Sequence, residues 1–169
     1  MKAKLIVEGK EFPIEIQDPE LQKLLTSQKK TGYERVDAGQ KYWVQNIRGD
    51  VCWGTESIFF TGNNEFYDSA NYYSDETIAE NNIRADKLLR QLRRFAVEHR
   101  KSEIDWHNES QCKYYIYNET NTTNLDIDYC HITRYFGGIY FDTAEAAQLA
   151  IETFHDELVW YFTEYKDSL

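Results

Sequence analysis

Apolar and polar residues alternate in short runs along most of this chain, which is the pattern of β-strands with one buried face. The run AKLIVEGKEFPIEI at 3–16 holds two such stretches joined by a Gly-Lys pair, and it predicts an N-terminal β-hairpin. Pro13 places the second of these strands at a sheet edge. Asp18 then precedes PELQKLL, which has the pattern of a short helix.

Two stretches of the chain recur later in the same order. KYWVQN at 41–46 returns as KYYIYN at 113–118, and NYYSDETIAE at 71–80 returns as IYFDTAEAAQ at 139–148. The first pair is separated by 72 residues and the second by 68, so we infer a duplicated unit of three strands and a helix. The expected strands are YERV, KYWVQN and DVCWGT in the first copy and CKYYIYN, LDIDYCHI and GGIYF in the second, with a loop at TGNNEFYDSAN.

Helical spacing of three, four or seven residues begins at Ser74 and again at Asp142, where Asp142 and Glu145 form a capping-box-like start. The apolar stripe of the first helix comprises Ile78, Ala85, Leu89, Leu92, Ala96 and His99, widened by Leu88 and Phe95. The stripe of the second comprises Ala147, Ile151, Phe154, Leu158, Tyr161 and Tyr165. Trp160 and Phe162 fall outside this stripe, so we expect the last helix to pack into a cleft or to form a homodimer with a second subunit.

These patterns together predict an α+β fold. It consists of two similar units, each a small antiparallel β-sheet packed with one long helix, plus the N-terminal β-hairpin. We expect boundaries at 1–32 for the hairpin and short helix, 33–104 for the first unit and 105–169 for the second.

Composition indicates a folded chain with an unusual surface. Of the 169 residues, 41% are hydrophobic and 28% charged, as in globular proteins, but 15% are aromatic, including thirteen Tyr. The aromatic residues are interpreted either as strand formers or as a binding surface. The net charge of −10 disfavours general binding to nucleic acid or to anionic membranes. The opening MKAKLIVEGKE has no leader pattern and no apolar run approaches about 18 residues, so we expect a cytoplasmic protein.

Residues that could carry chemistry are scattered. The four His lack metal-ligand spacing, the three Cys form no C-x-x-C pair, and no Gly-rich phosphate loop precedes a helix. DWH at 105–107 is the most enzyme-like cluster, but no nucleophile or second carboxylate stands at a suitable spacing. We therefore expect no enzymatic activity, no metal and no cofactor.

Charge is distributed unevenly between the first long helix and the rest of the chain. Residues 84–101 hold seven basic and two acidic residues, a net +5, so the remainder carries −15. The basic face is either a solvated helix surface or a site that contacts phosphates, whereas clustered carboxylates elsewhere can imitate the phosphates of a nucleic acid. The candidate partner-binding residues are Arg84, Lys87, Arg90 and Arg94 on the basic face, Asp126, Asp128, Asp156 and Glu157 on the acidic surface, and the aromatic Trp160 and Phe162.

Four stretches, KKTGYERVDAGQKYW, RADKLLRQLRRFAVEH, IDWHNESQCKYYIYN and ELVWYFTEYKD, resemble small proteins of prophages and integrative elements of Firmicutes. The resemblance extends from about Lys29 onward. It implies an origin in a mobile element, and it transfers no catalytic residues. Small acidic proteins of phages often oppose host defence, notably the anti-CRISPR proteins that bind an effector nuclease.

Three functions follow as hypotheses. The first is a phage or mobile-element protein, acting as a DNA mimic in the cytoplasm of its bacterial host, that inhibits a defence nuclease such as a CRISPR effector. The second is a nucleic-acid-associated accessory factor of phage replication or recombination that uses the basic helix. The third is a module that binds a small molecule, such as a signalling nucleotide, in an aromatic pocket between the repeats.

Overall fold

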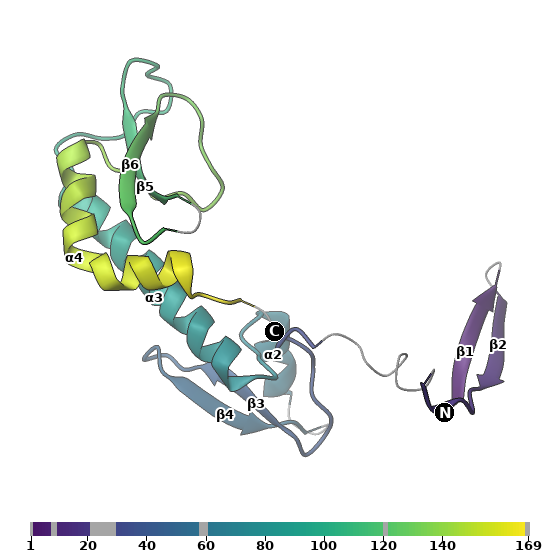
Figure 1. The fold of residues 1–169 in the computed structure, drawn as a ribbon. Helices are drawn as coiled ribbons and strands as arrows, with labels where there is room; N and C mark the ends of the chain where they lie inside the picture. The colour runs from purple at the N-terminus through teal and green to yellow at the C-terminus, as the bar shows by residue number, and fades with distance from the viewer. Residues whose placement is uncertain (1, 8–9, 21–29, 58–60, 120–121, 168–169) are drawn as a thin grey trace.

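The computed structural model describes residues 2–7, 10–20, 30–57, 61–119 and 122–167. The element order is β1 (Lys2–Val7), β2 (Lys10–Glu15), β3 (Lys41–Gln45), β4 (Val51–Thr55), α2 (Gly62–Asp68), α3 (Glu76–Glu98), β5 (Lys113–Asn118), β6 (Leu125–Cys130) and α4 (Ala144–Thr163). The strands form three antiparallel hairpins, β1–β2, β3–β4 and β5–β6. The predicted α+β fold is confirmed, including the N-terminal hairpin, which Figure 1 shows set apart from the other elements. The predicted helix PELQKLL lies largely outside the described residues.

Both predicted units are present, and each contains a hairpin, a single bridging residue and a long helix; the first also contains α2. Trp43 of β3 forms an antiparallel bridge with Tyr73, two residues before the N-cap of α3, and Tyr114 of β5 forms one with Phe141, two residues before the N-cap of α4. The bridging residue therefore extends each sheet on the side away from the second strand of its hairpin. The strand order is the same in the two units.

The structural alignment of the two units differs by one residue, in their first strands, from the alignment of the repeated strings. The bridges equate Trp43 with Tyr114, an offset of 71 residues, whereas the strings equate it with Tyr115. A shift of one residue moves every strand side chain to the other face. Lys113 consequently occupies the place of Tyr42, and both side chains are buried, at 0% and 3% exposure.

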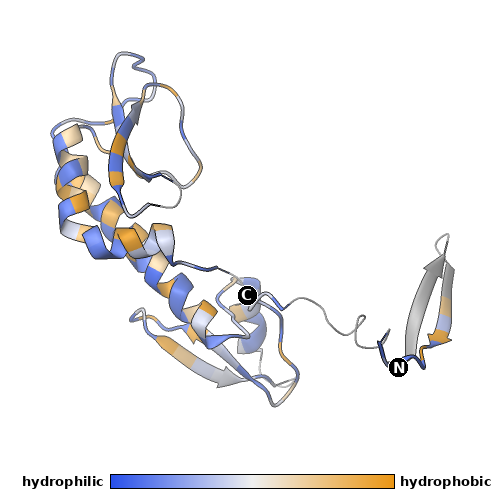
Figure 2. Ribbon diagram, viewed as in Figure 1, coloured by the Kyte–Doolittle hydropathy of each residue, from blue (hydrophilic) through white to orange (hydrophobic). Residues whose placement is uncertain are grey.

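The helix α3 links the units, and Figure 1 shows one hairpin near each of its ends. Its first turns pack Ile78 and Ala79 against Tyr73 and Trp43 of the first unit. Its second half contributes to the largest core cluster, which Figure 2 shows as hydrophobic colour where α3 and α4 meet. The buried members of that cluster are Leu88, Leu92, Phe95, Phe141, Ala146, Ala147, Ala150, Ile151 and Leu158.

Several sequence predictions of local structure are wrong. YERV is not a strand: the backbone N–H of Val36 donates to the hydroxyl of Tyr72 instead of to a neighbouring strand. In GGIYF only Phe141 pairs, with Tyr114. The expected loop TGNNEFYDSAN contains α2, because Phe66 packs against the buried Tyr42 cluster and tertiary packing overrides the low helix propensity of Gly and Asn.

The start of α4 also differs from the prediction. Thr143 is the N-cap, and its hydroxyl accepts a hydrogen bond from the backbone N–H of Ala146 at 3.1 Å. Asp142 faces the end of α3 instead, where its Oδ2 accepts from the N–H groups of Lys101 and Ser102, each at 2.7 Å. Its carboxylate therefore ties α4 to the segment that follows α3.

The helix α4 bends at Phe154, whose φ and ψ of −117° and 22° are not helical. The hydroxyl of the preceding Thr153 donates to the carbonyl of Leu149 at 2.7 Å, a contact that often bends helices. Figure 1 shows the two halves of α4 running in different directions. Because of the bend, the last turns of α4 cross α3.

Candidate functional site: an aromatic groove beside a Tyr–Asp face

The predicted basic face is largely paired with carboxylates of the protein itself. Arg84 makes a two-pronged contact with Glu157 of α4, at 2.8 and 3.1 Å, and its guanidinium lies 3.9 Å from the centroid of the Trp160 ring. Arg90 lies 3.9 Å from Asp86, Arg94 lies 3.7 Å from Glu98, and Arg100 lies 3.7 Å from Glu103. Among the described residues, no carboxylate pairs with Lys87.

These contacts bring three of the predicted partner-binding residues together. Arg84, Glu157 and Trp160 come together, but as a contact between α3 and α4, and Trp160 is only 7% exposed. Trp160 was expected to make the end of the last helix pack into a cleft or against a second subunit. Its ring packs within the chain, against Arg84 of α3, which leaves little of the side chain exposed to a partner.

Asp156 lies outside this contact between α3 and α4. It is fully exposed, and its Oδ1 lies 3.1 Å from Nδ1 of His155. The two side chains are adjacent in the chain and meet just after the non-helical Phe154. The pair lies on the surface, and no group of three or more His, Cys, Asp or Glu in the described part of the chain could hold a metal ion.

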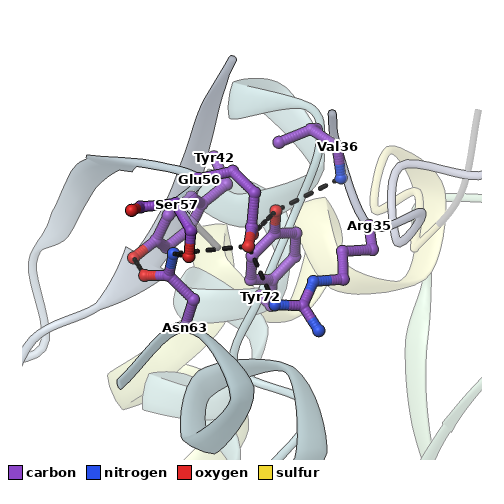
Figure 3. Close-up of polar contacts among 7 residues, drawn as sticks. All are labelled: Arg35, Val36, Tyr42, Glu56, Ser57, Asn63 and Tyr72. Carbon is purple, nitrogen blue, oxygen red and sulfur yellow. Dashed lines mark hydrogen bonds and ion pairs between the residues drawn. The ribbon is translucent and has the colours of Figure 1, made fainter. Parts of the chain in front are cut away.

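A buried polar cluster in the first unit is the alternative candidate site (Figure 3). Glu56 accepts hydrogen bonds from Arg35 at 2.8 Å, from the Tyr72 hydroxyl at 2.8 Å and from Asn63 at 3.3 Å. The Tyr42 hydroxyl donates in turn to Asn63 at 2.8 Å. Burial raises the pKa of Glu56, but the hydrogen bonds from Arg35 and Tyr72 outweigh it, so the pKa lies below its usual value. An ionised, fully bonded carboxylate is suited to holding α2 on the sheet rather than to proton transfer.

Asp126 and Asp128 belong to a face of the second hairpin that combines carboxylates with tyrosines. Across the β5–β6 ladder, Tyr117 pairs with Asp126 and Tyr115 with Asp128. Each tyrosine hydroxyl donates to the Oδ2 of its partner, at 3.3 and 3.0 Å. Burial, and then the neighbouring Asp128, raise the pKa of Tyr115, so its hydroxyl remains a donor at neutral pH. We call these four residues the Tyr–Asp face.

The remaining oxygen of each aspartate protects the outer edge of the sheet. Oδ1 of Asp126 accepts from the backbone N–H of Ile127 at 2.8 Å, and Oδ1 of Asp128 accepts from that of Tyr129 at 2.7 Å. Carboxylates on an edge strand oppose pairing with another strand. Both aspartates thus have an internal role, while their side chains stay exposed to a partner.

An apolar groove of about 390 Å³ adjoins this face. It lies between β5, the second half of α3, the end of α4 and the segment 135–141. Phe162, a predicted contact residue, lines it and is 39% exposed, and Phe136 on the far wall is fully exposed. Its other walls include Leu88, Leu89, Leu92, Tyr115, Ile116, Tyr117, Tyr135, Ile139, Tyr140, Phe141, Leu158 and Tyr161.

Part of this groove could be recognised from the sequence. The alternating tyrosines of KYYIYN were visible, but which of them share a face depends on the register, and the repeated strings placed that register one residue away. The wall contributed by Tyr135 and Phe136 comes from a turn at Gly137, whose φ is +74°. The sequence predicted a strand there, and this wall was missed.

The cluster DWH proves to be part of a structural loop. The Oδ1 of Asp105 accepts from the backbone N–H of His107, and the Trp106 ring faces the buried Lys113 at 5.6 Å and the Arg134 guanidinium at 5.4 Å. Lys113 donates to the carbonyls of Asn108 and His131, both at 2.7 Å. These contacts fix the loops that flank the second hairpin.

Comparison with protein-family models, with curated proteins and with solved structures finds no match to this chain. In the described part of the chain, the helices are too short or too polar to cross a membrane.

Proposed function

We propose that this chain is a phage or mobile-element protein that inhibits a bacterial defence nuclease, such as a CRISPR effector, by binding it in the host cytoplasm. The contact surface is the Tyr–Asp face together with the apolar groove beside it. One observation carries the proposal: exposed aromatic side chains line a groove next to two fixed carboxylates. The few residues that dominate the binding energy of protein interfaces are enriched in Tyr and Trp, and carboxylates complement a basic surface.

The charge pattern supports binding to a basic protein surface more than binding to nucleic acid. Arg84, Arg90 and Arg94 each lie within 4 Å of a carboxylate of the chain itself, so contacts to phosphate would first have to displace it. The whole chain carries −10, which favours a positively charged partner. A nuclease channel that binds DNA provides such a surface. Inhibition would then follow from competition with the DNA.

The groove also suits a second candidate function, the binding of a small molecule. Its volume of about 390 Å³ falls within the range of ligand pockets. Among the described residues that line it, none is Lys, Arg or His. The nearby Asp126 and Asp128 also disfavour an anion, so an uncharged or cationic aromatic compound fits the groove better than a signalling nucleotide does.

A plasmid-interference assay tests the proposed inhibition. Cells carrying a panel of CRISPR effectors are transformed with a targeted plasmid, with and without the protein. We expect the wild type to restore transformation against at least one effector and Phe162→Ala to lose most of this protection, because it removes an exposed wall of the groove. Leu149→Ala is the matched control, since Leu149 lies on the same helix with 43% exposure against 39% for Phe162. Equal protection by both variants would contradict a role for the groove.

A further inference from the structure

The two units differ at one position beside their bridging residues. In each unit the bridge is complete: Trp43 and Tyr73 exchange two backbone hydrogen bonds of 2.9 Å, and Tyr114 and Phe141 exchange bonds of 2.9 and 2.8 Å. The N–H and C=O of Trp43 and of Tyr114 therefore point away from the second strand of the hairpin. Because backbone direction alternates along a strand, the groups two residues later point the same way.

In the first unit a side chain satisfies those later groups. The N–H of Gln45 donates to Oδ1 of Asn71 at 2.7 Å, and Nδ2 of Asn71 donates to the carbonyl of Gln45 at 2.9 Å. The carboxamide thus takes the place of a neighbouring strand, and the free edge of β3 is closed at this residue.

In the second unit the corresponding residues cannot make this contact. Asn71 lies two residues before the bridging Tyr73, and the residue two before Phe141 is Ile139, which has no polar side chain. The N–H and C=O of Ile116, which match those of Gln45, therefore face the groove. Within the described part of the chain, no hydrogen bond satisfies either group. Backbone groups beside apolar walls are almost always paired in folded proteins.

The surroundings of this open edge define what would pair with it. An added strand beside β5 would place alternate side chains against the groove walls, including Leu92 and Phe162. The intervening side chains would lie on the same side as Tyr115 and Tyr117, within reach of the two aspartates. The outer edge of β6 is less suitable, because Asp126 and Asp128 already accept from the outward N–H groups of Ile127 and Tyr129.

We propose that β5 accepts an extended segment of a partner protein as an added strand, hydrogen-bonded to the backbone of Ile116. The segment alternates apolar residues, which enter the groove, with Lys or Arg residues, which lie over the Tyr–Asp face. This mode of recognition takes its affinity from main-chain hydrogen bonds and its specificity from alternate side chains. It rests on the proposed function in one respect only, namely that the partner is a protein.

Introducing the edge-closing residue of the first unit into the second unit tests the proposal. Ile139→Asn copies Asn71 and should close the edge of β5, while Ile139→Leu keeps the apolar wall. The probe is a capped peptide of about eight alternating Lys and Val residues, and its control carries N-methyl groups on alternate backbone nitrogens. We expect wild type and Ile139→Leu to bind the peptide equally and Ile139→Asn about tenfold more weakly, a loss on the scale of one hydrogen bond.

Amide hydrogen exchange locates the contact. Saturating peptide should slow exchange at the Ile116 N–H about tenfold, while the N-methylated peptide should not. Ile116→Pro removes this N–H without touching the β5–β6 ladder and serves as a second variant if Ile139→Asn does not fold. Equal binding by wild type and the folded variants, binding that leaves Ile116 unprotected, or no binding would overturn the proposal. Protection of Ile116 that rises with protein concentration alone would also overturn it, because a second copy would then occupy the edge.

The two proposals fail in different ways. If Ile139→Asn loses the peptide but inhibits a nuclease as the wild type does, the inhibitor uses another surface, and the added-strand mode is wrong for that partner. If the peptide binds and protects Ile116 but no nuclease is inhibited, strand addition stands and the proposed function is wrong.

Discussion

Glu56 lies buried between the β3–β4 hairpin and α2, and both of its carboxylate oxygens accept hydrogen bonds. Its partners come from three separate segments of the chain: Arg35 before the hairpin, Asn63 in α2 and Tyr72 before α3. One side chain thus joins three segments that also meet through the Val36–Tyr72 and Tyr42–Asn63 hydrogen bonds. Its side chain is only 5% exposed, so little water replaces a lost partner.

The ionisation of Glu56 predicts an acid limit to the stability of the first unit. Its pKa in the folded chain is below the unfolded value of about 4.3. The stabilisation is therefore present above about pH 4.3 and is lost as the pH falls through the lower folded pKa. Glu34 acts in the same direction, because the backbone N–H of Thr31 holds its pKa at about 2.

Glu56→Gln should lower the free energy of unfolding by about 1–3 kcal/mol at pH 7, the usual cost of disturbing a buried hydrogen-bonded charge. It should also flatten the dependence of stability on pH below about 5. Urea unfolding between pH 3 and pH 7 measures both effects. A variant with the stability and pH profile of the wild type would show that the Glu56 contacts add nothing to the folded state.

Single residues also explain why sequence could not place the site. Asp126 and Asp128 were recognised as acidic candidates, and the structure places both beside the groove. Arg84 and Glu157 were recognised too, but their spacing of 73 residues gave no sign that they bond to each other. Pairing between distant charges depends on how helices cross, and no local pattern encodes that crossing.

At the scale of elements, the difference between Asn71 and Ile139 decides whether a strand edge is closed or open. Asn71→Leu should leave the N–H and C=O of Gln45 unpaired and reduce the free energy of unfolding by about 1–3 kcal/mol. Urea unfolding at neutral pH measures the loss. Asn81→Leu is the control: among the described residues its side chain bonds only the exposed carbonyl of Lys166, so the change should stay within about 0.5 kcal/mol. Equal losses in the two variants would contradict the edge-closing role of Asn71.

Strong periodic patterns predicted most elements correctly. The three hairpins and the two long helices follow from alternation and from helical spacing over many residues. The short helix α2 was missed because its stability comes from contacts of Phe66 and Asn63 with distant residues, and not from local propensity. The repeated strings align Lys113 with Lys41, but Lys113 is buried and Lys41 is exposed. The structural repeat is therefore displaced by one residue from the sequence repeat.

At the scale of the whole molecule, α3 carries a unit near each end, and the charges divide between surfaces. Arg84, Arg90 and Arg94 of α3 are paired with carboxylates along the helix or on α4, while Asp126 and Asp128 are exposed on the second hairpin. We therefore place the proposed contact with a basic partner on the second unit rather than on the helix. Variants of the Tyr–Asp face and of the basic face of α3 therefore distinguish a nuclease inhibitor from a nucleic-acid-binding factor.

Cleavage by purified CRISPR effectors, each loaded with guide RNA and given target DNA, tests the proposed inhibition most directly. The protein should stop cleavage by at least one effector in competition with DNA, and higher salt should weaken the inhibition. Asp126→Asn with Asp128→Asn should abolish inhibition, while Arg90→Glu with Arg94→Glu should retain it. Full inhibition by the aspartate variant, or no inhibition of any effector by the wild type, would contradict binding through the Tyr–Asp face.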